Sequence, residues 1–323
     1  MKSSIPPGIG PKFGRNRPVA IGPHFKLHRY LRQALPVPPA SCDFSSQAQV
    51  SLRDIYGNDQ LGNCVIACAH HVQGVATGNA GVIVHATMNQ ILADYSAIGG
   101  YVPGDPSTDQ GCDEVTALNY YCSKGWATNG TKGLGWLTVD TTNKIEVQTA
   151  IALFEHLIIC QELPDSYVGP FPSGDGFTWG TGAPDPNNGH SYMACGYDSS
   201  GALIDTWALL GIETYAGLAE LATPAAGGGA YVILTPDILA KGAQKSPNGV
   251  AWTDLVTDFD SMGGSVPVPP APAPPPPDPG APVSQAEAQA WCLAALQAAH
   301  PLLTRTQAET IVQAALAANW RGT

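Results

Sequence analysis

The residue best suited to chemistry is a cysteine that stands where a loop turns into a helix. Cys64 follows Gly62 and Asn63, and the residues from 64 to about 75 are apolar and Ala-containing with helical spacing. The helix dipole and the unpaired N–H groups at a helix N-terminus stabilise a thiolate and lower the pKa of the cysteine. Gly62 permits the sharp backbone turn that exposes such a thiol. The segment therefore predicts a nucleophilic thiolate.

A histidine and an aspartate lie on two consecutive β-type runs in the second half of the chain. His190 follows a glycine on the first run, and Asp205 comes fifteen residues later on the next run, just before Thr206 and Trp207. Because such runs pair as antiparallel strands, we expect Asp205 beside the imidazole. There it would fix the tautomer while the other ring nitrogen faces Cys64. Trp207 is expected to shield the His–Asp pair from water.

Three segments of the sequence resemble the motifs of the papain-like cysteine peptidases of bacterial or phage type. Residues 51–54 (Ser-Leu-Arg-Asp) and 60–64 (Gln-Leu-Gly-Asn-Cys) are similar to the start of these enzymes. Residues 189–198 resemble their histidine strand, and 202–207 resemble their Asn-Ser-Trp segment, with Asp205 where the family has Asn. The motifs occur in the order that the family uses.

The resemblance implies an α+β fold with a helical lobe and a β-barrel-like lobe. It implies thiol-dependent hydrolysis of a peptide bond in a peptide or protein substrate, without a cofactor. Cys64 would be the nucleophile, His190 the general base and Asp205 the orienting residue.

The oxyanion hole departs from the pattern of the family. The family has a Gln six residues before its nucleophile, and this position is Asn58 here. Either Asn58 with its shorter amide, or Gln60 after a local shift, would join the Cys64 N–H as a donor. Loss of such a donor costs about 3–4 kcal/mol of transition-state stabilisation, so the rate of catalysis depends on this position.

The same residues also fit other interpretations. Cys64 fits an inert buried thiol, His190 a hydrogen-bonded core histidine, and Asp205 an ordinary turn acid. A zinc site is a further alternative, because Cys64, Cys68 and His71 lie on one helix face. Their spacing is not that of a zinc finger and no second Cys/His pair completes it, so we expect no metal.

The N-terminal arm, residues 1–37, is basic. The first 42 residues hold seven of the fifteen Lys and Arg residues and no acid, in a chain of net charge −11. Residues 9–13 and 21–25 repeat an Ile-Gly-Pro-x-Phe sequence, which favours two equivalent docking contacts. We expect the arm to dock on an acidic surface of its own body, a neighbouring subunit or, less in keeping with the sequence, nucleic acid. It is too short and Pro-rich for a folded inhibitory propeptide.

The remainder divides into a body at 38–265, a linker at 266–283 and a C-terminal segment at 284–323. Helical patterns at 64–75, 84–97, 112–124 and 145–158 precede β-type runs at 157–160, 190–197, 202–207 and 230–234. Ten prolines in residues 266–282 predict a polyproline-II spacer. Capping-box patterns predict helices at 284–299 and 306–319, a hairpin too small to be stable unless it docks.

Two functions are compatible with these features. The first is an active thiol peptidase. The second is a papain-fold structural or interaction module with weak or absent catalysis, attached through residues 1–37 and 284–323 to a larger assembly such as a phage particle. The sequence shows neither a signal peptide nor an apolar stretch that spans a bilayer, so we expect a cytoplasmic protein or a virion component.

Overall fold

The computed structural model of this chain describes residues 12–18, 25–29, 38–239, 289 and 312–313. The helical half of the molecule contains α1 (Gln49–Leu52), α2 (Cys64–Gly78), α3 (Met88–Gly99) and α4 (Glu114–Ser123). Three further helices accompany the strands: α5 (Lys144–Phe154), α6 (Asp165–Val168) and α7 (Tyr215–Leu221). The 3₁₀ turns are η1 (Leu27–Arg29), η2 (Ser46–Ala48), η3 (Pro106–Thr108), η4 (Pro186–Asn188) and η5 (Pro224–Ala226).

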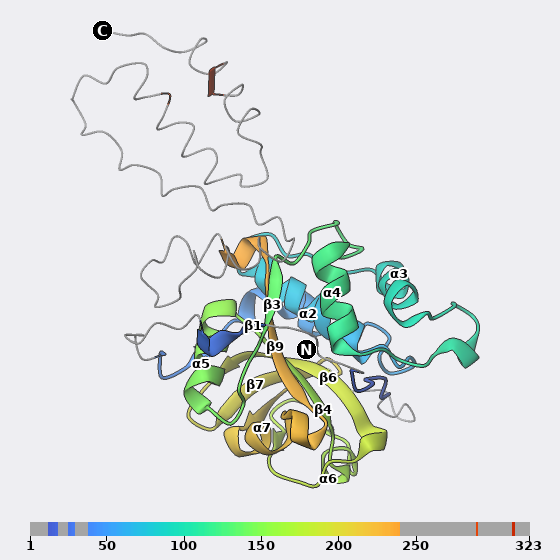
Figure 1. The fold of residues 1–323 in the computed structure, drawn as a ribbon, viewed down its shortest axis with the longest axis vertical. Helices are drawn as coiled ribbons and strands as arrows, with labels where there is room; N and C mark the ends of the chain where they lie inside the picture. The colour runs from blue at the N-terminus through green and yellow to red at the C-terminus, as the bar shows by residue number, and fades with distance from the viewer. Residues whose placement is uncertain (1–11, 19–24, 30–37, 240–288, 290–311, 314–323) are drawn as a thin grey trace, which may run out of the picture.

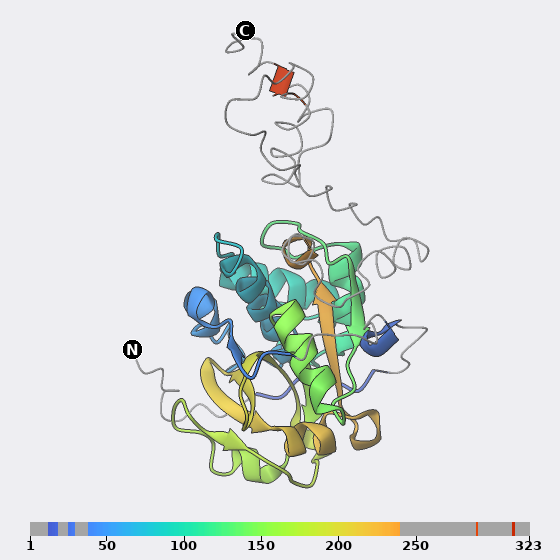
Figure 2. The same ribbon diagram turned by 90° about the vertical axis from the view of Figure 1, so that its left-hand side faces the viewer.

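One mixed sheet forms the other half. Its strands are β1 (Phe25–Lys26), β2 (Cys42–Asp43), β3 (Gly135–Thr138), β4 (Leu157–Glu162), β5 (Thr178–Trp179), β6 (Gly189–Tyr197), β7 (Gly201–Thr206), β8 (Leu209–Thr214) and β9 (Gly229–Leu234). The order within the described residues is β1-β3-β9-β4-β6-β7-β8-β5, and β2 pairs with β6. The strands curve beneath α2, α3 and α4 (Figure 1), and α5 lies along the sheet on the side that faces the viewer in Figure 2.

Strand β6 separates two hydrophobic cores. Successive side chains of a strand point to opposite faces. Tyr192 and Ala194 therefore join the core between the sheet and α5, whereas Met193 and Cys195 join the core that contains α2. The predicted α+β fold with two lobes is confirmed, and β6 is the element at which the lobes meet.

Polar caps decide where the helices begin. Thr87 and Gln90 form a capping box, so α3 starts at Met88 although the apolar pattern begins at 84. Helix α5 ends at Phe154 because the next residue, Glu155, has a left-handed backbone with φ 63°. Strand β4 begins at Leu157 directly after this turn, which removes the predicted overlap of helix and strand.

The predicted linker lies outside the described residues, as does nearly all of the predicted C-terminal hairpin.

Candidate active site

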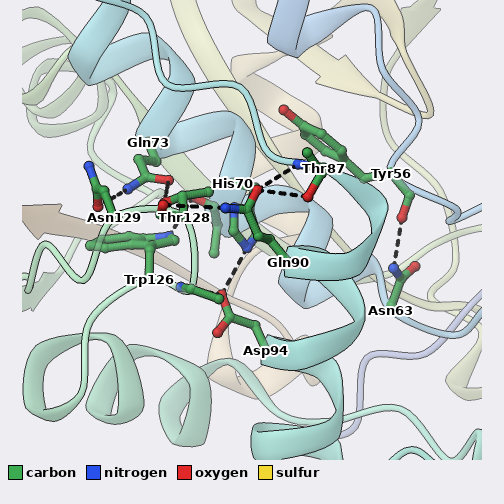
Figure 3. A network of polar contacts seen from close by, with 12 residues as sticks. Tyr56, Asn63, His70, Gln73, Thr87, Gln90, Asp94, Trp126, Thr128 and Asn129 are labelled. Atoms are coloured by element: carbon green, nitrogen blue, oxygen red, sulfur yellow. Dashed lines mark hydrogen bonds and ion pairs between the residues drawn. The ribbon is translucent and has the colours of Figure 1, made fainter. Parts of the chain in front are cut away.

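Buried polar contacts fix the helix that carries Cys64 (Figure 3). His70 of α2 bonds Asp94 of α3 through its Nε2 at 2.9 Å, and both side chains are almost fully buried. The Trp126 indole donates to the Ala69 carbonyl at 3.2 Å. Asn63, directly before the helix, donates from its amide to the Tyr56 carbonyl at 2.9 Å. These bonds fix the axial position and the rotation of α2, and thereby the position of Cys64.

Cys64 is the first residue of α2, as predicted, and is completely buried. Burial raises the pKa of its thiol to about 11, although hydrogen bonds from the Ser191, Gly14 and Val65 backbones act in the opposite direction. The N–H of Val65 belongs to the start of the helix itself. The helix terminus therefore favours the thiolate as expected, but in this structure burial is the larger effect.

His190 lies on β6 and lines the same small cavity as Cys64. Its Nε2 bonds the Thr206 hydroxyl at 2.8 Å, and its ring stacks on Trp207 with 3.8 Å between centroids. Its Nδ1 is buried and has no hydrogen-bond partner among the described residues. Burial lowers the pKa of His190 to about 3, so the imidazole is neutral at neutral pH. In the tautomer in which Nε2 carries the proton and donates to Thr206, Nδ1 is the free base.

Asp205 does not make the contact that the sequence predicted. Its carboxylate forms a buried ion pair with Nδ1 of His71 on α2. The cause is register: Asp205 pairs with Met193, so it shares the face of Met193, and the next residue, Thr206, shares the face of Tyr192 and His190. Thr206 therefore makes the contact with His190 that Asp205 was expected to make. Burial, the largest single effect, lowers the pKa of His71, but Asp205 and Asp54 together raise it above its usual value.

Of the two candidate oxyanion donors, the structure places Asn58 in the cavity. Asn58 is buried, and its amide donates to the Leu61 carbonyl at 3.0 Å and to the Lys12 carbonyl at 3.4 Å. Gln60 is exposed and reaches only the neighbouring Asp59 carboxylate, at 3.5 Å. The amide of Asn58 thus already reaches a peptide carbonyl in the cleft.

That carbonyl belongs to the N-terminal arm, whose residues 12–17 cross the site. The Gly14 and Arg15 N–H groups donate to the Gly189 carbonyl at 3.2 and 3.1 Å. On the opposite wall, Cys112 donates to the Gly14 carbonyl and accepts from the Asn16 N–H, both at 3.0 Å. The arm is held through its backbone from both lobes, as a bound peptide would be.

Glycines allow this close approach. A Cβ on Gly14 would lie 1.8 Å from the Gly62 carbonyl oxygen, and one on Gly111 would lie 1.9 Å from the Gly14 carbonyl oxygen. Phe13, the last residue of the first Ile-Gly-Pro-x-Phe copy, packs edge-on against His190 and Trp207 at 6.2 and 6.0 Å. Most of the second copy lies outside the described residues.

Two arm cations meet acids of the body. Arg15 bonds the Glu114 carboxylate of α4 through two nitrogens, at 2.9 and 2.7 Å, and both side chains are 1% exposed. Arg17 pairs with Glu162 at the end of β4, with the arginine side chain mostly exposed. Residues 12–17 of the basic arm therefore dock on acidic residues of their own body.

The zinc alternative finds no support in this geometry. No group of three or more His, Cys, Asp or Glu side chains in the described part of the chain is placed to hold a metal ion. His71 is paired with Asp205, and burial keeps the pKa of the Cys68 thiol well above its usual range. Among the same residues, no helix is long and apolar enough to cross a membrane.

The fold matches solved cysteine proteases. Xylellain, a cysteine protease from Xylella fastidiosa, aligns with a TM-score of 0.52 and 14% identity over 70% of this chain and 96% of that chain. Procathepsin L 3 of Tenebrio molitor aligns at 0.46 and 12%, over 70% and 76%, and procathepsin B of Trypanosoma congolense at 0.47 and 11%, over 69% and 86%. No protein-family model and no curated protein matches the sequence. The likeness to xylellain establishes a papain-like fold.

Sequence reasoning missed two parts of the site. The sequence pattern predicts Asp205 beside His190 and gives Thr206 no role, although either of two neighbouring strand residues can face His190. The arm segment 12–17 carried a usable signal, since Gly14 lies between an aromatic residue and an arginine in a basic stretch that precedes an acidic body.

Proposed function

We propose that this protein is a papain-like thiol peptidase, of the bacterial or phage type that its motifs resemble, in which Cys64 is the nucleophile and His190 the general base. The observation that carries the proposal is the small cavity that Cys64, the first residue of α2, lines together with His190, whose Nδ1 is buried without a hydrogen-bond partner among the described residues. Thr206 orients the imidazole and Trp207 covers it. Asn58 and the Cys64 N–H supply the oxyanion hole.

The proposed reaction uses these side chains in turn. Nδ1 of His190 takes the Cys64 proton, and the thiolate attacks the carbonyl carbon of the substrate. The carbonyl oxygen gains the negative charge and receives hydrogen bonds from Asn58 and the Cys64 N–H. His190 then gives its proton to the amine as the C–N bond breaks. A water molecule, deprotonated by His190, attacks the thioester, and release of the acid restores the thiol.

In the described state the site is latent. The thiol is protonated and the imidazole is neutral at pH 7, because burial raises the pKa of Cys64 and lowers that of His190. The arm produces part of this burial and lies where a substrate backbone would lie. The Gly14 backbone bonds the Cys64 thiol, and the Phe13 ring packs against His190, so the arm covers both catalytic groups. A few extended residues thus do what a folded propeptide would do.

Hydrolysis by a variant with a displaced arm tests the proposal. Gly14→Ala in the full chain sets a methyl group against the Gly62 carbonyl, which should expel the segment. We expect its hydrolysis of a mixed fluorogenic peptide library to exceed that of the unmodified chain by about tenfold or more. Adding Cys64→Ser should abolish it. Gly174→Ala is the matched control, because a Cβ there meets nothing within 4 Å.

No hydrolysis by folded Gly14→Ala would reject the peptidase and leave the second function, a structural or interaction module. This second function depends on residues 284–323 and on the arm outside residues 12–17. The proposed attachment to a larger assembly, in the cytoplasm or in a virion, depends on the same segments. Co-sedimentation of the full chain with such an assembly, set against a chain that ends at 265, tests the attachment separately.

A further inference from the structure

Arg15 follows Gly14, the arm residue whose backbone bonds the Cys64 thiol. The side chain of Arg15 fills a buried pocket. Its Nε and Nη2 bond the two Glu114 carboxylate oxygens, and its Nη1 donates to the Gly227 carbonyl at 2.5 Å. The bidentate geometry and the carbonyl together use the planar fork of a guanidinium, which a lysine cannot reproduce.

The body prepares this pocket for a cation. Glu114 opens α4, directly after the N-cap Asp113, and the Tyr231 hydroxyl donates to it at 3.3 Å. With Arg15 withdrawn, Glu114 would keep a carboxylate in a buried position with a neutral phenol as its partner. A buried carboxylate without a cation is strongly disfavoured, so the pocket selects a guanidinium.

The backbone of the arm carries Arg15 to the pocket. Gly189 and Cys112 bond only the backbone of residues 14 to 16. The residue before the arginine must be a glycine, because a Cβ on Gly14 would lie 1.8 Å from the Gly62 carbonyl oxygen. The arm therefore presents a glycine followed by an arginine, and the arginine is the side chain that the pocket binds.

We propose that the pocket formed by Glu114, Tyr231 and the Gly227 carbonyl is an arginine-selective substrate subsite. The substrates are then peptides in which a glycine directly precedes an arginine that lies within two residues of the cleaved bond, and Arg15 occupies the subsite in the latent state. That the pocket binds a substrate rests on the proposed peptidase function. That the pocket selects arginine is tested by binding alone.

Binding is measured on the full chain with Gly14→Ala, Arg15→Ala and Cys64→Ser, which vacates the cleft and blocks turnover. The probes are two fluorescent peptides that carry a glycine followed by either arginine or citrulline, two side chains that have nearly the same shape but differ in charge. We expect the arginine peptide to bind about 30-fold or more tightly, and Glu114→Gln in the same chain to remove the difference. Equal affinities, or a preference that survives Glu114→Gln, would overturn the subsite.

The same peptides with Cys64 restored separate this inference from the proposed function. Equal cleavage of both peptides rejects the subsite and keeps the peptidase. Selective binding without cleavage keeps the arginine pocket and rejects the peptidase.

A second measurement needs no change in the arm. Glu114→Gln alone should raise the rate of Cys64 alkylation about tenfold or more, since the buried pair holds the arm. Glu162→Gln, which neutralises the partner of the largely exposed Arg17, should raise it far less. Equal rates in the two variants would contradict the role of Glu114.

Discussion

At the scale of single residues, Thr206 is the side chain that hydrogen-bonds the His190 ring. Its hydroxyl is the partner of Nε2, and a hydrogen bond to a ring that becomes charged contributes about 1.5–3 kcal/mol. In the arm-displaced Gly14→Ala chain, we expect Thr206→Val to lower kcat/KM about 10- to 100-fold with unchanged thermal stability, and Thr206→Ser to retain most of the activity. Full activity in the Val variant would show that another group orients His190.

The sequence placed Cys64 at a helix start and His190 on a strand correctly, because helix starts and strand runs are local features. It did not separate Asp205 from Thr206, because these neighbours point to opposite faces and only the pairing of β7 with β6 decides which faces His190. A register shift between Ala194 and Gly196 lies in the same pairing, and it depends on the whole sheet.

A second residue-scale prediction concerns Glu213. It is buried beside Tyr192 and Gln161, and burial raises the pKa of its carboxyl to about 7. Between pH 4.5 and 7 the folded state keeps a proton that the unfolded state has lost. The contribution of this group to stability is therefore complete below about pH 4.5 and is lost as the pH rises through 7.

Glu213→Gln should remove this loss of stability at higher pH. In urea unfolding, we expect the variant to gain stability relative to the unmodified protein between pH 5 and pH 8, by up to about 3 kcal/mol. The comparison at each pH cancels the opposite slope from His190, which is protonated more readily in the unfolded state. A difference between the two proteins that does not vary with pH would contradict the assignment.

At the scale of elements, α2 is fixed chiefly by its bond to α3. Asp94→Ala would leave the buried His70 ring unbonded and remove an acceptor from the Ala127 N–H. We expect a loss of about 3 kcal/mol in the free energy of unfolding, measured with urea. Asp105→Ala, at an exposed 3₁₀ cap, is the control and should change little. A tolerant Asp94 variant would show that apolar packing alone positions α2.

Helical and β-type periodicity predicted the longer elements α2, α3, α4, α5, β4, β6, β7 and β9, with errors at their ends, but it did not predict β3, β8 or α7. The path of the arm could not be predicted in the same way. Its contacts to Gly189 and Cys112 run through backbone atoms, and its fit against Gly62 and Gly111 depends on side chains that are absent. Such contacts leave no periodic pattern in a sequence.

At the scale of the whole molecule, the arm joins the two lobes. It bonds Glu114 and Cys112 on the helical side, and Gly189 and Glu162 on the sheet side. Single removal of Arg15 or Glu114 leaves a buried charge without its partner and should cost about 3–5 kcal/mol, whereas removal of both should cost much less. A double-mutant cycle with Arg15→Met and Glu114→Leu, followed by urea unfolding, measures this coupling. Additive losses would show that the pair is not a unit.

The measurement that bears most directly on the whole account is the alkylation rate of Cys64 in the full chain, followed by peptide mapping. In Gly14→Ala, iodoacetamide should modify Cys64 faster than any of the other seven cysteines, with a rate that falls in a His190→Ala background. In the unmodified chain, Cys64 should react slowly, because burial raises the pKa of its thiol to about 11. Modification of Cys64 no faster than that of the remaining cysteines in folded Gly14→Ala would contradict a latent thiol nucleophile beneath the arm.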